Sequence, residues 1–208
     1  DKGKGLVNRK TEEPAAQAKL REAIVAPYPD RQIPISLSLN YLDTPDKGIA
    51  LSASMQVPAE FLSFSSEVEK EKAHVDLAGV VFNDRGESRT RFGEQVTLSA
   101  PTATVKASSR NLTYSHTIYL GPGLYQVRVA ARDAGTGLVG SANAWIEIPD
   151  LSNHRLTLSS LIVGERLEPA AIKATASNGP FPDPVLLSID RRFKRDSFLR
   201  YLIFVYNS

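Results

Sequence analysis

Apolar and polar residues alternate through most of the middle of this chain, and that two-residue period constrains its fold more than any other feature. In residues 33–41 every odd-numbered residue is apolar, with Ser36, Ser38 and Asn40 among those between them. A period of two places alternate side chains on one face of a β-strand. The same period, weaker in places, predicts further strands at residues 49–57, 73–82, 88–98, 112–120, 124–132 and 138–148.

Turn-forming residues separate these stretches at nearly even spacing. Residues 43–48, 83–86, 121–123 and 133–137 are rich in Asp, Asn, Pro and Gly, which favour tight turns. Strands connected this closely leave no room for the crossover helices of a parallel sheet. The pattern therefore predicts a mainly β protein, an immunoglobulin-like antiparallel β-sandwich.

Three regions follow from the same pattern. Residues 1–30 are expected to form a linker and a short helix, and residues 31–150 the sandwich. Residues 151–208 are expected to be the start of a second β-rich domain that is incomplete. In that region residues 156–163 and 199–206 are strand candidates, and the proline-rich stretch 164–184 is expected to be a long loop.

Composition excludes several classes of function. The chain has 25 basic and 23 acidic side chains, a formal charge of +2. This balance does not indicate the basic surface that binds nucleic acid, so we expect no nucleic-acid partner. No apolar run approaches the roughly 20 residues that cross a bilayer, so we expect no membrane insertion. Cysteine is absent, which excludes disulfides and thiolate metal sites. We expect no cofactor.

Catalytic and metal motifs are also missing from the sequence. His74, His116 and His154 are each about forty residues apart, without metal-ligand spacing, and no GxSxG elbow occurs. Acidic pairs such as those in residues 43–46 and 84–87 lie in turn-like segments, where such residues are common. We therefore expect no enzyme and no metal site, with calcium at these acidic turns left open as an alternative.

Two groups of residues are candidates for binding. Trp145 is predicted to point outward from an otherwise apolar strand, which suggests a carbohydrate-binding sandwich as one alternative. The basic run Arg191, Arg192 and Phe193 combines charge with an aromatic ring that could stack on a ligand. Solvated charges at the entry to a strand are the simpler interpretation of that run.

The last apolar stretch is the candidate for contact with another polypeptide. Its alternate residues Leu199, Tyr201, Ile203 and Val205 are expected to form an unpaired strand edge that accepts or donates a strand. The expected partner is a protein or a neighbouring domain of the same polypeptide. The main functional hypothesis is therefore a non-catalytic structural or protein-interaction module.

A series of short motifs runs along nearly the whole chain. They are Lys4-Gly5, Ala26-Pro27-Tyr28-Pro29, Ile33-Pro34-Ile35, the stretch 42–48, the stretch 121–129, Arg132-Asp133, Thr136-Gly137 and the stretch 193–207. The order of these motifs is more specific than any one of them. Together they resemble the region that follows the von Willebrand factor A-type domain in bacterial VWFA-related proteins.

This resemblance implies a secreted or cell-envelope location and an adhesive or assembly role. It also implies an A-type domain upstream and further strands after Ser208. The metal-dependent adhesion motif of that domain, Asp-x-Ser-x-Ser, does not occur in this sequence, so its metal-binding role is not carried over.

Overall fold

Most of the described chain lies in β-strands. The computed structural model describes residues 9–67, 70–101, 111–166, 185–187, 189–193, 195 and 198–207. The elements are α1 (Arg9–Val25), β1 (Ser36–Thr44), β2 (Gly48–Pro58), a 3-10 helix (Ala59–Phe61), β3 (Ser65–Glu67), β4 (Lys70–Asn83), β5 (Ser88–Pro101), β6 (Asn111–Tyr119), β7 (Gly123–Asp133), β8 (Val139–Ile148), a second 3-10 helix (Leu151–Asn153), β9 (Thr157–Leu158), β10 (Ile162–Arg166), β11 (Val185–Leu187), β12 (Leu199–Leu202) and β13 (Val205–Tyr206).

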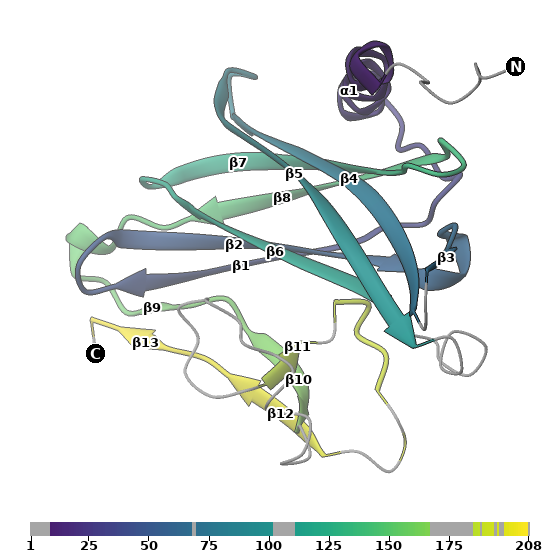
Figure 1. Cartoon of the computed structure of the whole chain (residues 1–208). Coiled ribbons are helices and arrows are strands. Elements are labelled where there is room, and N and C mark those ends of the chain that lie inside the picture. The colour runs from purple at the N-terminus through teal and green to yellow at the C-terminus, as the bar shows by residue number, and fades with distance from the viewer. Residues whose placement is uncertain are drawn as a thin grey trace, which may run out of the picture.

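Two antiparallel sheets form the body of the molecule. Sheet A joins β5, β4, β7 and β8 in that order, with the short β3 also paired to β4; sheet B joins β1, β2 and β6. The sheets lie face to face as two layers (Figure 1). Three strands facing four, with consecutive strands passing between sheets, make an immunoglobulin-like sandwich, and the predicted fold class is confirmed.

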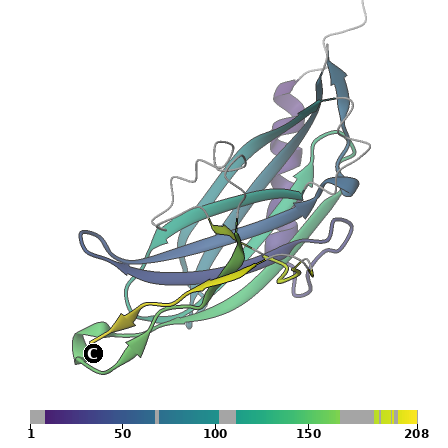
Figure 2. The same cartoon turned by 90° about the horizontal axis from the view of Figure 1, so that it is seen from below.

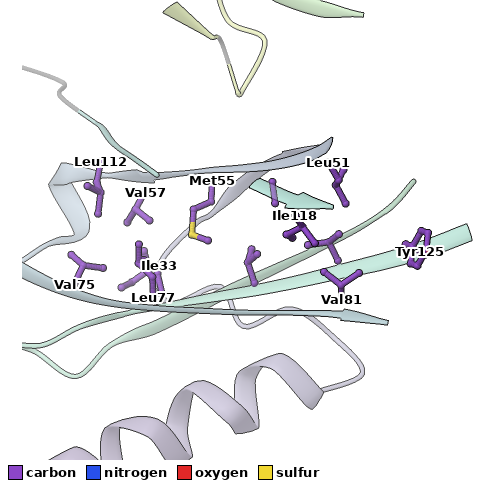
Figure 3. Close-up of a cluster of buried hydrophobic side chains, with 14 of the residues drawn as sticks. Ile33, Leu51, Met55, Val57, Val75, Leu77, Val81, Leu112, Ile118 and Tyr125 are labelled. Atoms are coloured by element: carbon purple, nitrogen blue, oxygen red, sulfur yellow. The ribbon is translucent and has the colours of Figure 1, made fainter. Parts of the chain in front are cut away.

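Alternating apolar side chains of both sheets fill the space between them (Figure 3). Leu51, Met55 and Val57 of β2 point from sheet B toward Val75 and the other inward residues of sheet A. These four side chains are buried. The two-residue period of the sequence therefore determines which side chains form the core. A shift of any strand by one residue would turn its apolar side chains away from the space between the sheets.

A tyrosine fixes the connection between the two sheets at β6 and β7. Tyr125, near the start of β7, is buried, and its hydroxyl donates a hydrogen bond to the Gly121 carbonyl oxygen at 3.1 Å. A tyrosine that bonds back to the preceding corner is a hallmark of immunoglobulin-like sandwiches. The turn 121–123 is thus fastened to the strand that follows it.

We expect Tyr125→Phe to lower the free energy of unfolding by about 1 kcal/mol, because a partly buried hydrogen bond is lost while the ring stays. Chemical denaturation measures this difference. Tyr28→Phe is the matched control, since Tyr28 is 83% exposed. Equal stability of Tyr125→Phe and wild type would contradict the assigned role.

The N-terminal helix covers part of the outer face of sheet A. Leu20, Ala23 and Ile24 of α1 form a second buried cluster with Ala130 and Val139 of that sheet. In addition, Arg128 of β7 donates from its guanidinium to the Ile24 carbonyl oxygen at 3.2 Å, where a cation interacts favourably with the end of a helix. The predicted short helix is therefore an integral layer.

The segment between α1 and β1 crosses from one sheet to the other. Asp30 and Ile33 bond to the edge of β8: the Ile33 amide donates to the Val139 carbonyl at 3.2 Å, and the Ser141 amide donates to the Asp30 carbonyl at 2.9 Å. From Ser36 onward the chain pairs with β2 in sheet B instead. This crossing closes the sandwich along its β1–β8 edge.

The C-terminal strands pack against the outer face of sheet B, on the side opposite α1 (Figures 1 and 2). The Tyr41 amide donates to Ser160 Oγ at 2.9 Å and the Asp43 amide donates to the Tyr206 hydroxyl at 2.9 Å. Two expected strands are each divided: 156–163 into β9 and β10, and 199–206 into β12 and β13. The first residues of the expected loop, 164–166, belong instead to β10, where they pair with β11. The rest of that loop, residues 167–184, lies outside the described residues.

Within the described part of the chain, no helix is both long and apolar enough to cross a membrane.

Candidate functional site

A row of side chains crosses the outer face of sheet A next to α1. Phe82 of β4 lies opposite Gln126 of β7, and Gln126 lies opposite Trp145 of β8. Trp145 is 54% exposed, as the alternation along β8 predicts. Arg128 contacts two members of this row: its Nε donates to Gln126 Oε1 at 2.9 Å, and its guanidinium lies 5.5 Å from the centre of the Phe82 ring.

A groove of about 1170 Å³ lies between α1 and the β4–β5 hairpin, and Phe82 lines it. Small or aliphatic residues, Ala78, Val80 and Gly93, are part of its lining. Polar residues that also line it are Gln17, Arg21, His74, Asp76, Arg91, Glu94 and Gln95. Asp76 is already engaged, because it accepts from Arg132 at 2.9 Å and from Gln95 at 2.7 Å.

Titratable side chains meet at the open edge between β5 and β6. The His116 ring stacks on Phe92 at 4.3 Å, and Tyr114 Oη lies 3.4 Å from His116 Nδ1. Burial lowers the pKa of His116, although the charge of Glu94 acts in the opposite direction. Burial, followed by the hydrogen bond and the charge of Glu94, raises the pKa of Tyr114 to about 12. At neutral pH both rings are therefore uncharged.

The C-terminal strands carry a surface of exposed apolar side chains. More than half of the exposed large apolar residues in the described chain lie between Leu156 and Val205. Tyr201 is 72% and Leu199 is 56% exposed, and both are on β12. Leu158 and Val205, also exposed, lie opposite each other on β9 and β13.

The predicted edge residues occupy different positions on this surface. Leu199 and Tyr201 are in β12, Val205 is in β13, and Ile203 lies between the two strands. β12 pairs with β10 on one side, and no strand of the described chain pairs with its other side. We refer to Leu156, Leu158, Leu161, Phe198, Leu199, Tyr201, Ile203 and Val205 as the C-terminal apolar surface.

The basic run lies apart from Trp145, on the opposite side of the sandwich. Arg191 has a left-handed backbone, with φ of 54°, and lines a small cavity against Ser38 and Ser54 of sheet B. Phe193 is partly exposed, and the Arg192 amide donates to Asp190 Oδ1 at 3.1 Å. The structure therefore does not bring the predicted binding residues into one site.

In one of the two acidic turns, 84–87, Glu87 has a local structural role, because its Oε2 accepts from Asn83 Nδ2 at 2.8 Å. Asn83 Oδ1 accepts from the Arg85 and Glu87 amides at 3.1 and 2.8 Å, which closes the β4–β5 turn. No group of three or more His, Cys, Asp or Glu side chains arranged to hold a metal ion occurs among the described residues.

Sequence reasoning missed the groove and the edge cluster around His116. Both depend on which strands become neighbours, and periodicity carries no information about that. The one available signal for the cluster is Gly79, in the middle of an apolar strand, since an isolated glycine there indicates close approach of another group. A Cβ atom at Gly79 would lie 2.1 Å from the Phe92 ring.

Comparison with known proteins gives only distant structural similarity. No family model and no curated protein matches the chain. Among solved structures, a β-glucuronidase from Bacteroides uniformis aligns with 60% of this chain and 13% of its own, at 15% identity and a TM-score of 0.37. The structural genomics target SoR45 aligns with 58% of this chain and 88% of its own, at 9% identity and a TM-score of 0.32.

Proposed function

We propose that this chain is a non-catalytic protein-interaction module of a secreted or cell-envelope protein, and that it binds its partner through the C-terminal apolar surface. The observation that carries the proposal is the exposure of Leu199 and Tyr201 on an edge strand. The sequence resemblance to the VWFA-related proteins supports the location and the assembly role.

The apolar content of this surface supports contact with another polypeptide. Monomeric soluble proteins rarely leave large contiguous apolar patches in water. Here the exposed residues follow one another along β12 and β13 at alternate positions, from Leu199 to Val205. A partner that covers them would gain binding free energy of about 25 cal/mol for each Å² of apolar area removed from water.

The free side of β12 supports a particular mode of binding. An edge strand presents unpaired backbone amide and carbonyl groups, to which an extended segment can add as a further strand. Hydrogen bonds of the main chain would give affinity, and alternate apolar side chains of the partner would meet Leu199 and Tyr201. The partner is therefore an extended segment with apolar residues at every second position.

We expect extended peptides with alternating apolar residues to bind this chain and to slow hydrogen exchange at the β12 amides. Peptide arrays identify binders, and hydrogen exchange with mass spectrometry locates them. Leu199→Lys and Tyr201→Lys should each weaken binding by roughly tenfold, because each removes an apolar contact and adds a charge at the site. Leu124→Lys, on the outer face of sheet A, is the matched control.

Unchanged exchange at Leu199–Leu202 with every peptide, in a chain that stays monomeric, would contradict the proposal. Equal loss of binding in Leu124→Lys would also contradict it. A carbohydrate-binding role, the alternative function, needs Trp145 on the opposite side of the sandwich. The two surfaces are separate, so one chain can carry both activities.

A further inference from the structure

The outer face of sheet A beside α1 combines aromatic rings with fixed polar groups. In the row Phe82, Gln126 and Trp145, an amide lies between two rings. Exposed Asn143 and Glu147 flank Trp145 on the same face of β8. Rings of this kind pack against the apolar faces of sugars. Amide groups donate hydrogen bonds to sugar hydroxyls and accept them, and carboxylates accept hydrogen bonds from these hydroxyls.

Two of the three side chains in the row, Gln126 and Phe82, are restrained before any ligand arrives. Arg128 contacts its neighbours in three ways: it donates to Gln126 and to the Ile24 carbonyl, and its guanidinium lies over the Phe82 ring. The side chains of Gln126 and Phe82 are therefore restrained by a residue that is itself anchored to α1. Preorganised groups lose less conformational entropy on binding, which favours affinity.

The row is continuous with the groove between α1 and the β4–β5 hairpin, because Phe82 belongs to both. From Phe82 the groove leads to Arg91, Gln17 and Gln95, which offer further hydrogen-bonding groups, and its lining includes small residues. A ligand of several units can thus contact Trp145 at one end and enter the groove at the other.

The charges along this path favour an uncharged or weakly charged ligand. Arg21 and Arg91 line the groove together with Glu94, and Glu147 flanks Trp145. Charges of both signs lie along the path, which therefore differs from the uniformly basic grooves that follow a nucleic acid backbone. The alternation of rings with amides and charges of both signs also differs from the largely apolar C-terminal surface.

We propose that this face binds an oligosaccharide, which lies across β8, β7 and β4 with one end in the groove. Strands in a sheet are about 4.8 Å apart, so the backbones of Phe82 and Trp145 lie roughly 10 Å apart across two strand spacings. A ligand that places one sugar on each ring spans this distance. The proposed ligand therefore contains at least two linked sugars.

A glycan array probed with the whole chain, followed by calorimetric titration of the best-bound glycan, tests this proposal. We expect affinity to rise from the monosaccharide to the trisaccharide of the same series. Trp145→Ala should weaken binding of the trisaccharide by at least about tenfold, since the stacking surface is lost. Arg91→Ala should weaken the longer ligand and leave the monosaccharide unaffected.

Tyr201→Ala is the matched control, because Tyr201 is an even more exposed aromatic residue on the other side of the sandwich. It should bind glycans as wild type does while losing affinity for the strand-forming peptides. Absence of any glycan binding, equal binding by Trp145→Ala, or a monosaccharide that binds as tightly as the trisaccharide would each overturn the inference. None of these results would affect the proposed protein-binding surface.

Discussion

Asp133→Ala is expected to lower the free energy of unfolding by about 3 kcal/mol, a large share of the stability of an ordinary domain. The carboxylate lies at the end of β7 with no exposed surface. Its Oδ1 accepts from the Ser63 amide at 3.2 Å. Its Oδ2 accepts from Ser63 Oγ at 2.6 Å and from the Thr136 amide and Oγ1 at 2.8 and 2.7 Å. Alanine would leave these donors without their acceptor.

The same contacts predict how this loss depends on pH. Burial raises the pKa of Asp133, but the hydrogen bonds from Ser63 and Thr136 outweigh it and hold the pKa below its ordinary value. A depressed pKa in the folded state stabilises the fold above the unfolded-state value of about 3.9. That contribution disappears as pH falls through the folded-state pKa.

Urea denaturation of wild type and Asp133→Ala at a series of pH values checks both expectations. The difference in stability should be largest near neutral pH and should shrink in acid. Asp46→Ala is the control, because Asp46 is an exposed carboxylate in the β1–β2 turn. Ordinary surface substitutions change stability by less than about 0.5 kcal/mol. A difference that small at neutral pH would show that the hydrogen bonds that Asp133 accepts from Ser63 and Thr136 do not stabilise the fold.

The strands of the sandwich could be predicted because burial on one face imposes a two-residue period. That period places Tyr125 and Val127 in the core, and the structure buries both. It also predicts that Trp145 faces outward, and Trp145 is exposed. In each case the property follows from one strand and the layer it faces.

What covers an outer face could not be predicted in this way. Ser52 and Ser54 lie on the face of β2 opposite the core, yet both are buried. Pairing places them in the middle strand of sheet B, over which the C-terminal strands lie (Figure 1). The period assigns a polar residue to a face, but contacts distant in sequence decide whether that face meets water.

The division of the C-terminal strands has a similar cause. Residues 199–206 read as one apolar strand, but Phe204 exchanges hydrogen bonds with Ser159. The Ser159 amide donates to the Phe204 carbonyl at 2.9 Å, and the Phe204 amide donates to Ser159 Oγ at 2.8 Å. The chain thus changes partner between β12, which pairs with β10, and β13, which pairs with β9. Local hydrophobicity does not predict such a change of partner.

Gly140→Ala is expected to lower the free energy of unfolding by about 3 kcal/mol or more. The reason is that the segment between α1 and β1, which crosses from one sheet to the other, cannot stay in place beside a larger residue. A Cβ atom at this position would lie 1.9 Å from the Ile33 carbonyl oxygen and 2.8 Å from its carbonyl carbon. Both are backbone atoms, so no rotation of a side chain relieves the overlap.

Moving that segment away from β8 would break the hydrogen bond from the Ile33 amide to Val139 and the two that join Asp30 to Ser141. It would also expose Ile33, which is fully buried. Hydrogen exchange should therefore become faster at Ile33 and Ser141 in the variant, together with a lower denaturation midpoint. Gly121→Ala is the control, because a Cβ atom there meets nothing within 4 Å. Equal stability of the two variants would mean that the crossing at the β1–β8 edge is not held by close backbone approach.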